Sequence, residues 1–212
     1  PDPSRTRFSL EAVTTPGAPA QTASFLAIGA SSMQLEKDGT FSVKGDARGP
    51  YRMVVSPIGP VLEPMPGVRS WTVKSVMIGG RDVADLPIQI KPGEDVTDVV
   101  VTMTDQQTEV SGTVLDNLNR PTAGFPIVVF ATDRAYWPAG NARVRKIQPA
   151  SNGKFTILGL PAGEYYVCAV TDVEANDLRD PAFLESLAAS SFKITLRPGE
   201  KRPLDLKLGG GF

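Results

Sequence analysis

Residues 152–165 read Asn-Gly-Lys-Phe-Thr-Ile-Leu-Gly-Leu-Pro-Ala-Gly-Glu-Tyr and contain the clearest structural signal in the chain. Phe155 and Ile157 alternate with polar residues, which is the period of a strand with one buried face. Asn152-Gly153 stands before that strand and favours a hairpin, because a type I′ turn needs positive φ at both central residues. The glycines and proline that follow turn the chain toward a second strand, where Tyr165 can bury its ring and keep its hydroxyl at the edge of the core.

A similar arrangement occurs earlier in the chain. Asp38-Gly39 precedes the strand-like residues 40–43, and Tyr51 follows Gly39 at the same separation of twelve residues that joins Gly153 to Tyr165. Further on, Lys-Pro-Gly-Glu at 91–94 corresponds to Arg-Pro-Gly-Glu at 197–200, and each precedes a further strand-like segment. The sequence therefore predicts an internal repeat and two similar domains.

The strand periodicity and the scattered Gly and Pro turn signals predict an all-β protein of two tandem seven-stranded β-sandwiches. We expect the first domain over residues 1–106, the second over 107–208 and a flexible tail over 209–212. One segment is helical in pattern: residues 180–188 begin with an acidic cap and a proline in the first turn, followed by apolar residues at helical spacing.

The fourteen residues 152–165 resemble the motif of the carboxypeptidase regulatory-like domain, a prealbumin-like (transthyretin-like) β-sandwich related to collagen-adhesin B-type repeats. The first half departs from that motif, because Gly-Asp-Ala-Arg-Gly-Pro-Tyr at 45–51 replaces the Gly-Leu-Pro-x-Gly-x-Tyr turn. Together the halves resemble the terminal region of long exported bacterial repeat proteins. The resemblance implies an extracellular, cell-surface or periplasmic location, and it implies a fold far more firmly than a function.

Composition excludes several classes of function. Lys and Arg total 22 against 23 Asp and Glu, a net charge of −1, so the basic face that nucleic acid requires is not expected. No apolar run reaches the roughly 20 residues of a membrane helix, so no membrane insertion is expected. The chain has no histidine, which removes Ser-His-Asp and Cys-His nucleophiles and imidazole metal ligands. We expect no enzyme, no catalytic residue, no cofactor and no metal, and we expect the single Cys168 to be a small buried hydrophobe.

The repeat offset predicts a gap in the first domain. It places residues 7–13 at the position of the second strand of the other domain, near residues 126–130, so that the first strand has no counterpart. A sandwich without that strand exposes unpaired backbone groups and an apolar groove. The candidate residues for strand addition are Arg7, Phe8, Leu10 and Val13.

Three explanations of the gap remain open at the level of sequence. A neighbouring molecule could supply the strand by β-strand addition. Alternatively, the preceding strand or repeat belongs to a longer chain that was cut. Finally, a shorter loop in this half would let residues 7–13 form the first strand themselves.

An aromatic and basic group forms the second candidate site. Rings beside arginine side chains can stack on a sugar or hold a peptide, and this group follows a core strand in a long loop, where binding residues tend to gather. The alternative is that the tryptophan packs over the end of the sandwich. The candidate residues are Trp137, Tyr136, Arg134, Arg143 and Arg145.

Two acidic groups are weaker candidates. The acidic residues at 172, 174, 177 and 180 could offer oxygen ligands to Ca²⁺, yet they lack the spacing of a dedicated calcium loop. Those at 82, 85, 95 and 98 lie among turn signals. Turn and helix-cap roles are therefore favoured over metal binding for both groups.

Three hypotheses of function follow. The leading one is a non-catalytic structural or assembly module of an exported bacterial protein, a cell-surface or filament component joined to copies of itself or to a neighbouring repeat domain by strand pairing. The second is a carbohydrate- or peptide-binding module centred on Trp137. The third is an accessory domain of a larger exported peptidase.

Overall fold

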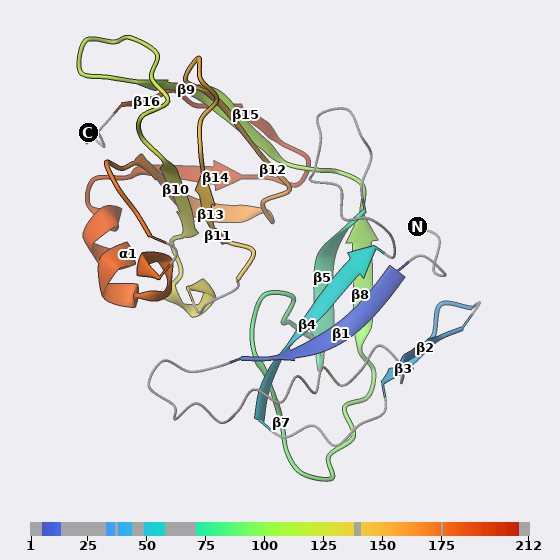
Figure 1. Ribbon diagram of the computed structural model, residues 1–212. Helices are drawn as coiled ribbons and strands as arrows, with labels where there is room; N and C mark the ends of the chain where they lie inside the picture. Colours follow the sequence, from blue (N-terminus) through green and yellow to red (C-terminus); the bar gives the residue numbers. More distant parts are fainter. Residues whose placement is uncertain are drawn as a thin grey trace. The chain divides into compact units, whose positions relative to one another are not determined.

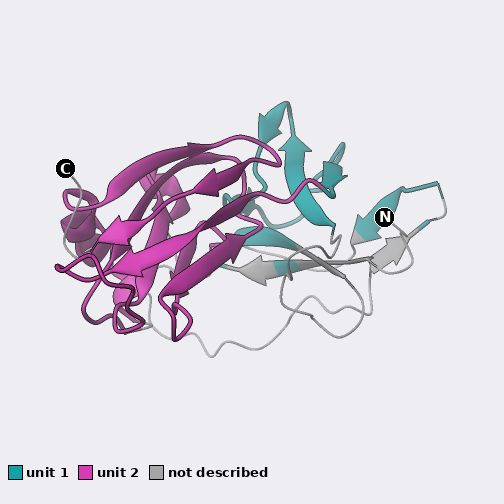
Figure 2. Ribbon diagram, turned by 90° about the horizontal axis from the view of Figure 1, so that it is seen from above, with its two compact units in different colours: residues 1–105 teal, residues 106–212 magenta. Residues whose placement is uncertain are grey.

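The computed structural model describes residues 6–13, 33–36, 38–43, 49–57, 71–137, 141–174 and 176–207. The chain divides into two compact units, Pro1–Asp105 (unit 1) and Gln106–Phe212 (unit 2), which Figure 2 distinguishes by colour. Each unit is described by itself below.

The described residues of unit 2 form two sheets, both visible in Figure 1. One has the strand order β11-β10-β13-β14, and the other has the order β12-β9-β15, with β16 also paired to β9. The strands are β9 (Glu109–Leu115), β10 (Ile127–Ala131), β11 (Val144–Ile147), β12 (Lys154–Leu158), β13 (Gly163–Ala169), β14 (Phe192–Leu196), β15 (Lys201–Pro203) and β16 (Leu206–Lys207).

The two sheets of unit 2 enclose one apolar core. Phe155 and Ile157 on β12 are buried, while Lys154 and Thr156, which alternate with them, are exposed, as the period of two predicts. They belong to the same buried cluster as Ile127 and Val129 of β10 and Tyr165 of β13, which lie in the other sheet. Unit 2 is therefore a β-sandwich whose core residues come from both sheets.

The helix of unit 2 covers the outer face of one sheet. Helix α1 (Pro181–Ala188) begins where Asp180 accepts a hydrogen bond from the Ala182 N–H, and Pro181 stands at its first turn. Leu184 of this helix is fully buried in a second cluster with Val128 and Phe130 of β10. This layer explains why every residue of β10 is buried, since both faces of that strand are covered.

The described residues of unit 1 form a smaller buried core than those of unit 2. They are arranged in three sheets. Their orders are β1-β4-β7, β6-β5-β8 and the pair β2-β3. Its buried cluster is formed by Met53, Val76 and Val83. The strands are β1 (Thr6–Ala12), β2 (Met33–Leu35), β3 (Phe41–Val43), β4 (Gly49–Pro57), β5 (Thr72–Ile78), β6 (Arg81–Asp82), β7 (Ile88–Ile90) and β8 (Val100–Thr104).

The two Asx-Gly turns have the same hydrogen bonds in different settings. The Gly39 N–H donates to the Glu36 carbonyl, and the Gly153 N–H donates to the Ala150 carbonyl at the same distance along the chain. The first turn closes the β2–β3 hairpin, as predicted. The second closes no hairpin: β11 pairs with β10 and β12 pairs with β9, so the turn joins the two sheets. The hairpin expected at Asn152-Gly153 is therefore wrong, because the partner of β12 is a distant strand.

The all-β fold class and the short helix near residues 180–188 are confirmed. In the part of the chain that the structure describes, no helix is long and apolar enough to span a membrane.

Candidate functional site

The sheet β1-β4-β7 of unit 1 has the pairing of β10-β13-β14 in unit 2. Strand β4 is antiparallel to β1 and to β7, and β13 is likewise antiparallel to β10 and to β14. The central strands β4 and β13 carry Tyr51 and Tyr165, the two tyrosines that the repeat aligns. Strand β1 therefore takes the place of β10, the second strand of unit 2.

Strand β9 is the first and central strand of its sheet in unit 2. It runs antiparallel to β12, with Val110 opposite Ile157. On its other edge it runs parallel to β15, with Glu109 opposite Lys201, and β16 continues this parallel pairing. Val110 and Val114 of β9 are fully buried, so this strand supplies the middle of the core on its side.

The offsets of the two turn motifs locate the equivalent position in unit 1. The Asx-Gly turns (153 − 39 = 114) place β12 on β3, and the Pro-Gly turns (199 − 93 = 106) place β15 on residues 95–97. Within the described residues, β3 pairs with β2 and β8 pairs with β5, and no described strand pairs with both β3 and β8. Residues 94–99 take part in no strand ladder there either.

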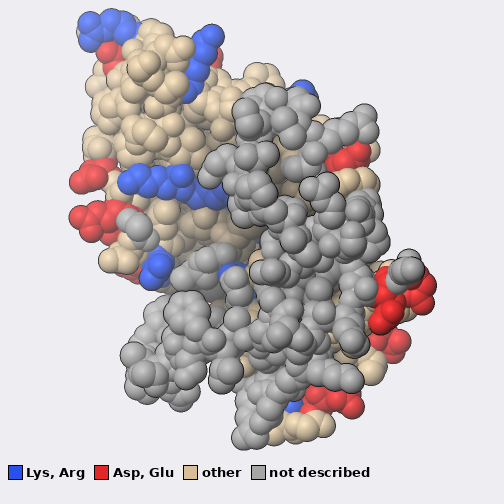
Figure 3. Space-filling view, turned by 45° about the vertical axis from the view of Figure 1, so that its right-hand side comes forward, with Lys and Arg blue, Asp and Glu red and all other residues tan. Residues whose placement is uncertain are grey.

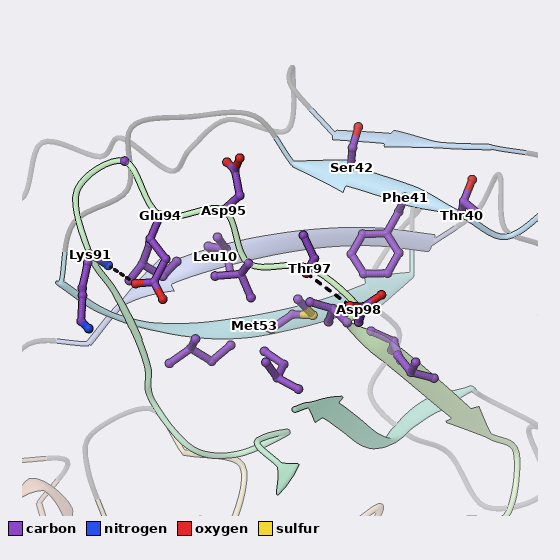
Figure 4. A pocket seen from close by; sticks show the side chains of 18 of the residues that line it. Leu10, Thr40, Phe41, Ser42, Met53, Lys91, Glu94, Asp95, Thr97 and Asp98 are labelled. Carbon is purple, nitrogen blue, oxygen red and sulfur yellow. Dashed lines mark hydrogen bonds between the residues drawn. The ribbon is translucent and has the colours of Figure 1, made fainter. Parts of the chain in front are cut away.

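A cavity of about 970 Å³ occupies this position of unit 1 and is called the groove below. Its floor is the inner face of the sheet β1-β4-β7, and its two walls are residues 39–42 and residues 93–101. Figure 4 shows the side chains of Leu10, Phe41 and Met53 directed into it from β1, β3 and β4. Met53 and Ile90 are each only 9% exposed, so the floor is apolar and continuous with the core.

The wall formed by residues 93–101 carries the charged rim of the groove. Glu94, Asp95 and Asp98 are exposed, and Figure 4 shows the three on the same chain segment. The Lys91 N–H donates to the Glu94 carboxylate at 3.1 Å, and the Thr97 hydroxyl donates to the Asp98 carboxylate at 3.3 Å. The rim therefore presents more negative than positive charge to anything that enters. On the face shown in Figure 3, acidic and basic side chains of the described residues lie close to one another at several places.

The four residues predicted for strand addition lie on or beside β1. Strand β1 is paired with β4 along its whole length, and the Val13 N–H donates to the Pro50 carbonyl. Leu10 lines the groove floor, whereas the side chains of Arg7 and Phe8 lie outside the described residues. The walls of the groove were missed, although the same repeat offset that located the gap also maps them.

The structure places Trp137 in the core of unit 2. Its ring is 4% exposed, its Nε1 donates to the Ala131 carbonyl at 2.7 Å, and it meets Phe130 edge-on at 5.7 Å between ring centroids. A ring with its faces covered and its N–H bonded inside the fold offers no stacking surface to a sugar. The interpretation of Trp137 as a ligand platform is therefore corrected, and packing over the sheet accounts for it.

The arginines of this group hold loops of unit 2. Arg143 donates to the Tyr165 hydroxyl at 3.2 Å, and its guanidinium lies 4.5 Å from the centroid of the Tyr136 ring. Arg145 donates to two carbonyls of the Gly-Leu-Pro turn, those of residues 158 and 159. Arg134 is exposed and forms an ion pair with Glu185 of helix α1. Arg143, Arg145 and Tyr136 therefore come together at the turn of the motif, whereas Arg134 lies against helix α1 and Trp137 in the core.

Among the acidic candidates, Asp82, Asp177 and Asp180 have the turn and cap roles that the sequence favours. Asp82 accepts hydrogen bonds from the Val76 and Ala84 N–H groups, and Asp177 accepts one from the Glu174 N–H. Among the described residues, no group of three potential metal-ligating side chains is placed to hold a metal ion. Cys168 is buried, and burial raises the pKa of its thiol.

No family model matches the chain, and no curated protein matches it. Solved structures match at low identity. The major pilin subunit BcpA of Bacillus cereus is 15% identical over 74% of this chain and 42% of its own, with a TM-score of 0.35. A streptococcal ancillary pilin is 10% identical over 98% of this chain and 62% of its own, with a TM-score of 0.35.

A further match is a putative carbohydrate-binding protein from Pseudomonas aeruginosa, which is 10% identical over 48% of this chain and 88% of its own, with a TM-score of 0.30. This chain thus spans less than two thirds of both pilins. Likenesses this distant do not reveal what the chain binds.

Proposed function

We propose that this chain is a non-catalytic assembly module of an exported protein, and that unit 1 accepts a β-strand from a neighbouring chain or domain. The observation that carries the proposal is the groove between β3 and residues 93–101. The offsets of the two turn motifs map its two walls onto β12 and β15, the strands that flank β9 in unit 2. The groove is thus the acceptor, and an extended segment with alternating apolar residues is the ligand.

Strand β9 buries Val110 and Val114 and pairs with strands on both of its edges. The groove in unit 1 has an apolar floor, with Met53 and Ile90 at its base. One of its walls includes residues 94–99, whose backbone belongs to no strand. Adding a strand provides main-chain hydrogen bonds along both walls, while alternate side chains enter the floor. Burial of apolar side chains contributes about 25 cal/mol per Å², which favours filling the groove.

The buried state of Trp137 weakens the main support for a carbohydrate-binding module. A strand acceptor needs no catalytic group, which agrees with the absence of histidine from the whole sequence. Self-copies or a neighbouring repeat domain are the partners we propose, and the location we propose is outside the cytoplasm.

The direct test is binding of a fluorescent peptide with the sequence of residues 108–116, which contains β9. We expect the chain to bind it, and we expect Val101→Asp, which places a carboxylate in the groove lining, to abolish binding. Thr102→Asp is the matched control, because Thr102 is exposed on the same strand and does not line the groove. Circular dichroism checks that each variant is folded.

A milder variant guards against loss of folding in Val101→Asp. Ile88→Ala removes apolar surface from the groove floor and should weaken peptide binding several-fold in a chain that remains folded. Equal affinity of the native chain for the peptide and for a scrambled version of it would contradict the proposal.

A further inference from the structure

We infer the direction and the charge of the strand that the groove accepts; the inference rests on the proposed function above. The incoming strand runs antiparallel to β3 and parallel to residues 95–101. It carries Lys or Arg at the position where β9 carries Glu109.

The direction follows from the arrangement in unit 2. There β9 is antiparallel to β12 and parallel to β15 and β16. By the offsets of the two turn motifs, the counterparts of these strands in unit 1 are β3 and residues 95–101, of which Val100 and Val101 belong to β8 and also pair with β5. An incoming strand that pairs with both walls as β9 does can have only one orientation, with its first residues beside Asp95 and its last residues beside Thr40.

The charge of the incoming strand follows from one position at which the two units carry side chains of opposite charge. In unit 2, Lys201 stands two residues after the Pro-Gly turn, and its Nζ lies 3.6 Å from the Glu109 carboxylate on β9. In unit 1, the residue two positions after the equivalent turn is Asp95, and Glu94 precedes it. A carboxylate at the start of the incoming strand would meet like charge there, whereas a basic side chain would meet opposite charge. The rim therefore selects against strands of the β9 type that keep the acidic residue.

Disulfide trapping tests the direction. Two peptides are used, each with the sequence of residues 109–115 and the change Glu109→Lys. One carries an added cysteine before its first residue, and the other carries an added cysteine after its last residue. The chain variants are Asp95→Cys and Thr40→Cys, at exposed positions on opposite walls of the groove. Cys168 does not compete because it is buried and its thiol pKa is raised.

The expected result is that Asp95→Cys traps the peptide with the first-position cysteine and Thr40→Cys traps the other. The reverse pattern, or equal trapping in both, would overturn the inferred direction while leaving strand binding itself intact. Absence of binding by either peptide in the fluorescence assay would instead remove the proposed function.

Exchanging the charges of the peptide and of the groove rim tests the inferred charge of the incoming strand. We expect the native chain to bind the peptide with Glu109→Lys about two- to fivefold more tightly than the peptide that keeps Glu109, the range of exposed ion pairs. In the Asp95→Lys variant of the chain the preference should reverse. An unchanged preference in that variant would show that the rim does not select the charge.

Discussion

Gly112 is the residue at which β9 lies closest to its neighbours. A Cβ at this position would stand 1.9 Å from the Leu204 carbonyl oxygen, and the Leu204 N–H donates to the Ser111 carbonyl beside it. Since both groups are backbone, neither can move aside without breaking the pairing of β9. Only glycine fits between them.

We predict that Gly112→Ala lowers the free energy of unfolding of unit 2 by about 1–3 kcal/mol, the range for overpacked sites. Urea denaturation of the chain measures the change. Gly124→Ala is the control: its Cβ would meet nothing closer than 3.5 Å, at the Thr122 hydroxyl oxygen, so its stability should stay within about 0.5 kcal/mol of the native value.

Cys168 provides a second prediction at this scale. The residue is 5% exposed, and burial raises the pKa of its thiol, with a smaller opposing effect from the Ser191 hydroxyl. We expect a thiol reagent such as dithionitrobenzoate to leave the native chain unlabelled at about pH 8 and to label one thiol in denaturant. Rapid labelling of the folded chain would contradict the buried placement.

The burial of single residues was predicted correctly on a strand, where the alternation of apolar and polar residues determines it. It was predicted wrongly for a residue in a loop. Phe155 and Ile157 are buried as the alternation requires. The burial of Trp137 depends on the helix layer and on Phe130, which no local pattern specifies. The groove walls were not predicted, because the candidate residues named from the sequence all lie on or beside β1, although the offsets of the two turn motifs also map the walls.

At the scale of elements, the turn after β9 depends on one carboxylate. Asp116 accepts hydrogen bonds from the Leu118 and Arg120 N–H groups and from the Arg120 Nε. The hydrogen bond from the Arg120 backbone is the main cause that lowers the pKa of Asp116 below its ordinary 3.8. A group whose pKa is lowered by folding stabilises the fold above its unfolded pKa, and that contribution is lost as the pH falls through the folded value.

We therefore predict that Asp116→Asn lowers the urea midpoint of unit 2 modestly at about pH 7, because the charged acceptor is lost. The difference between native and variant should shrink as the pH falls below 3.8 and the native carboxylate becomes protonated. Denaturation curves at neutral pH and at about pH 3 measure this. A difference that stays constant with pH would show that the charge is not involved.

Helix α1 stabilises the outer face of its sheet through one buried side chain. Leu184 is fully buried against β10, so Leu184→Ala should cost about 2–4 kcal/mol of unfolding free energy, the range for truncated core leucines. Glu185→Ala removes only an exposed ion pair with Arg134 and should cost less than about 1 kcal/mol. Calorimetry of the two variants compares them directly.

Elements whose sequence signals lie within a few residues were predicted, whereas the pairing of a strand with a partner far away in the sequence was not. The cap and proline of helix α1 and the Asp38-Gly39 hairpin are specified within a few residues. The pairing of β12 with β9, across some forty residues, depends on the sheet as a whole. Turn chemistry alone thus predicted a hairpin at Asn152-Gly153 that the chain does not make.

At the scale of the whole molecule, the described residues of the two units share the antiparallel orders β1-β4-β7 and β10-β13-β14, whereas their other sheets differ. Unit 2 holds β9 between β12 and β15, whereas unit 1 has a groove between the corresponding segments. We propose that this difference defines the function, since a complete sandwich resists strand addition and an incomplete one accepts it.

Ligand linkage gives a prediction at this scale. A strand that binds only the folded unit 1 should raise its stability by about 2.7 kcal/mol at a peptide concentration of about 100 times Kd. Proteolysis followed by mass spectrometry separates the two units. Peptide addition should slow cleavage within residues 71–105 and leave cleavage within unit 2 unchanged, and equal protection of both units would argue for non-specific binding.

Hydrogen–deuterium exchange with and without the peptide of residues 108–116 tests strand acceptance most directly. The predicted result is slower exchange of the amides at residues 40–43 and 94–101, with little change along β1, β4 and unit 2. Unchanged exchange at those two walls under saturating peptide, or protection at another sheet edge, would contradict the assignment of the groove as the strand acceptor.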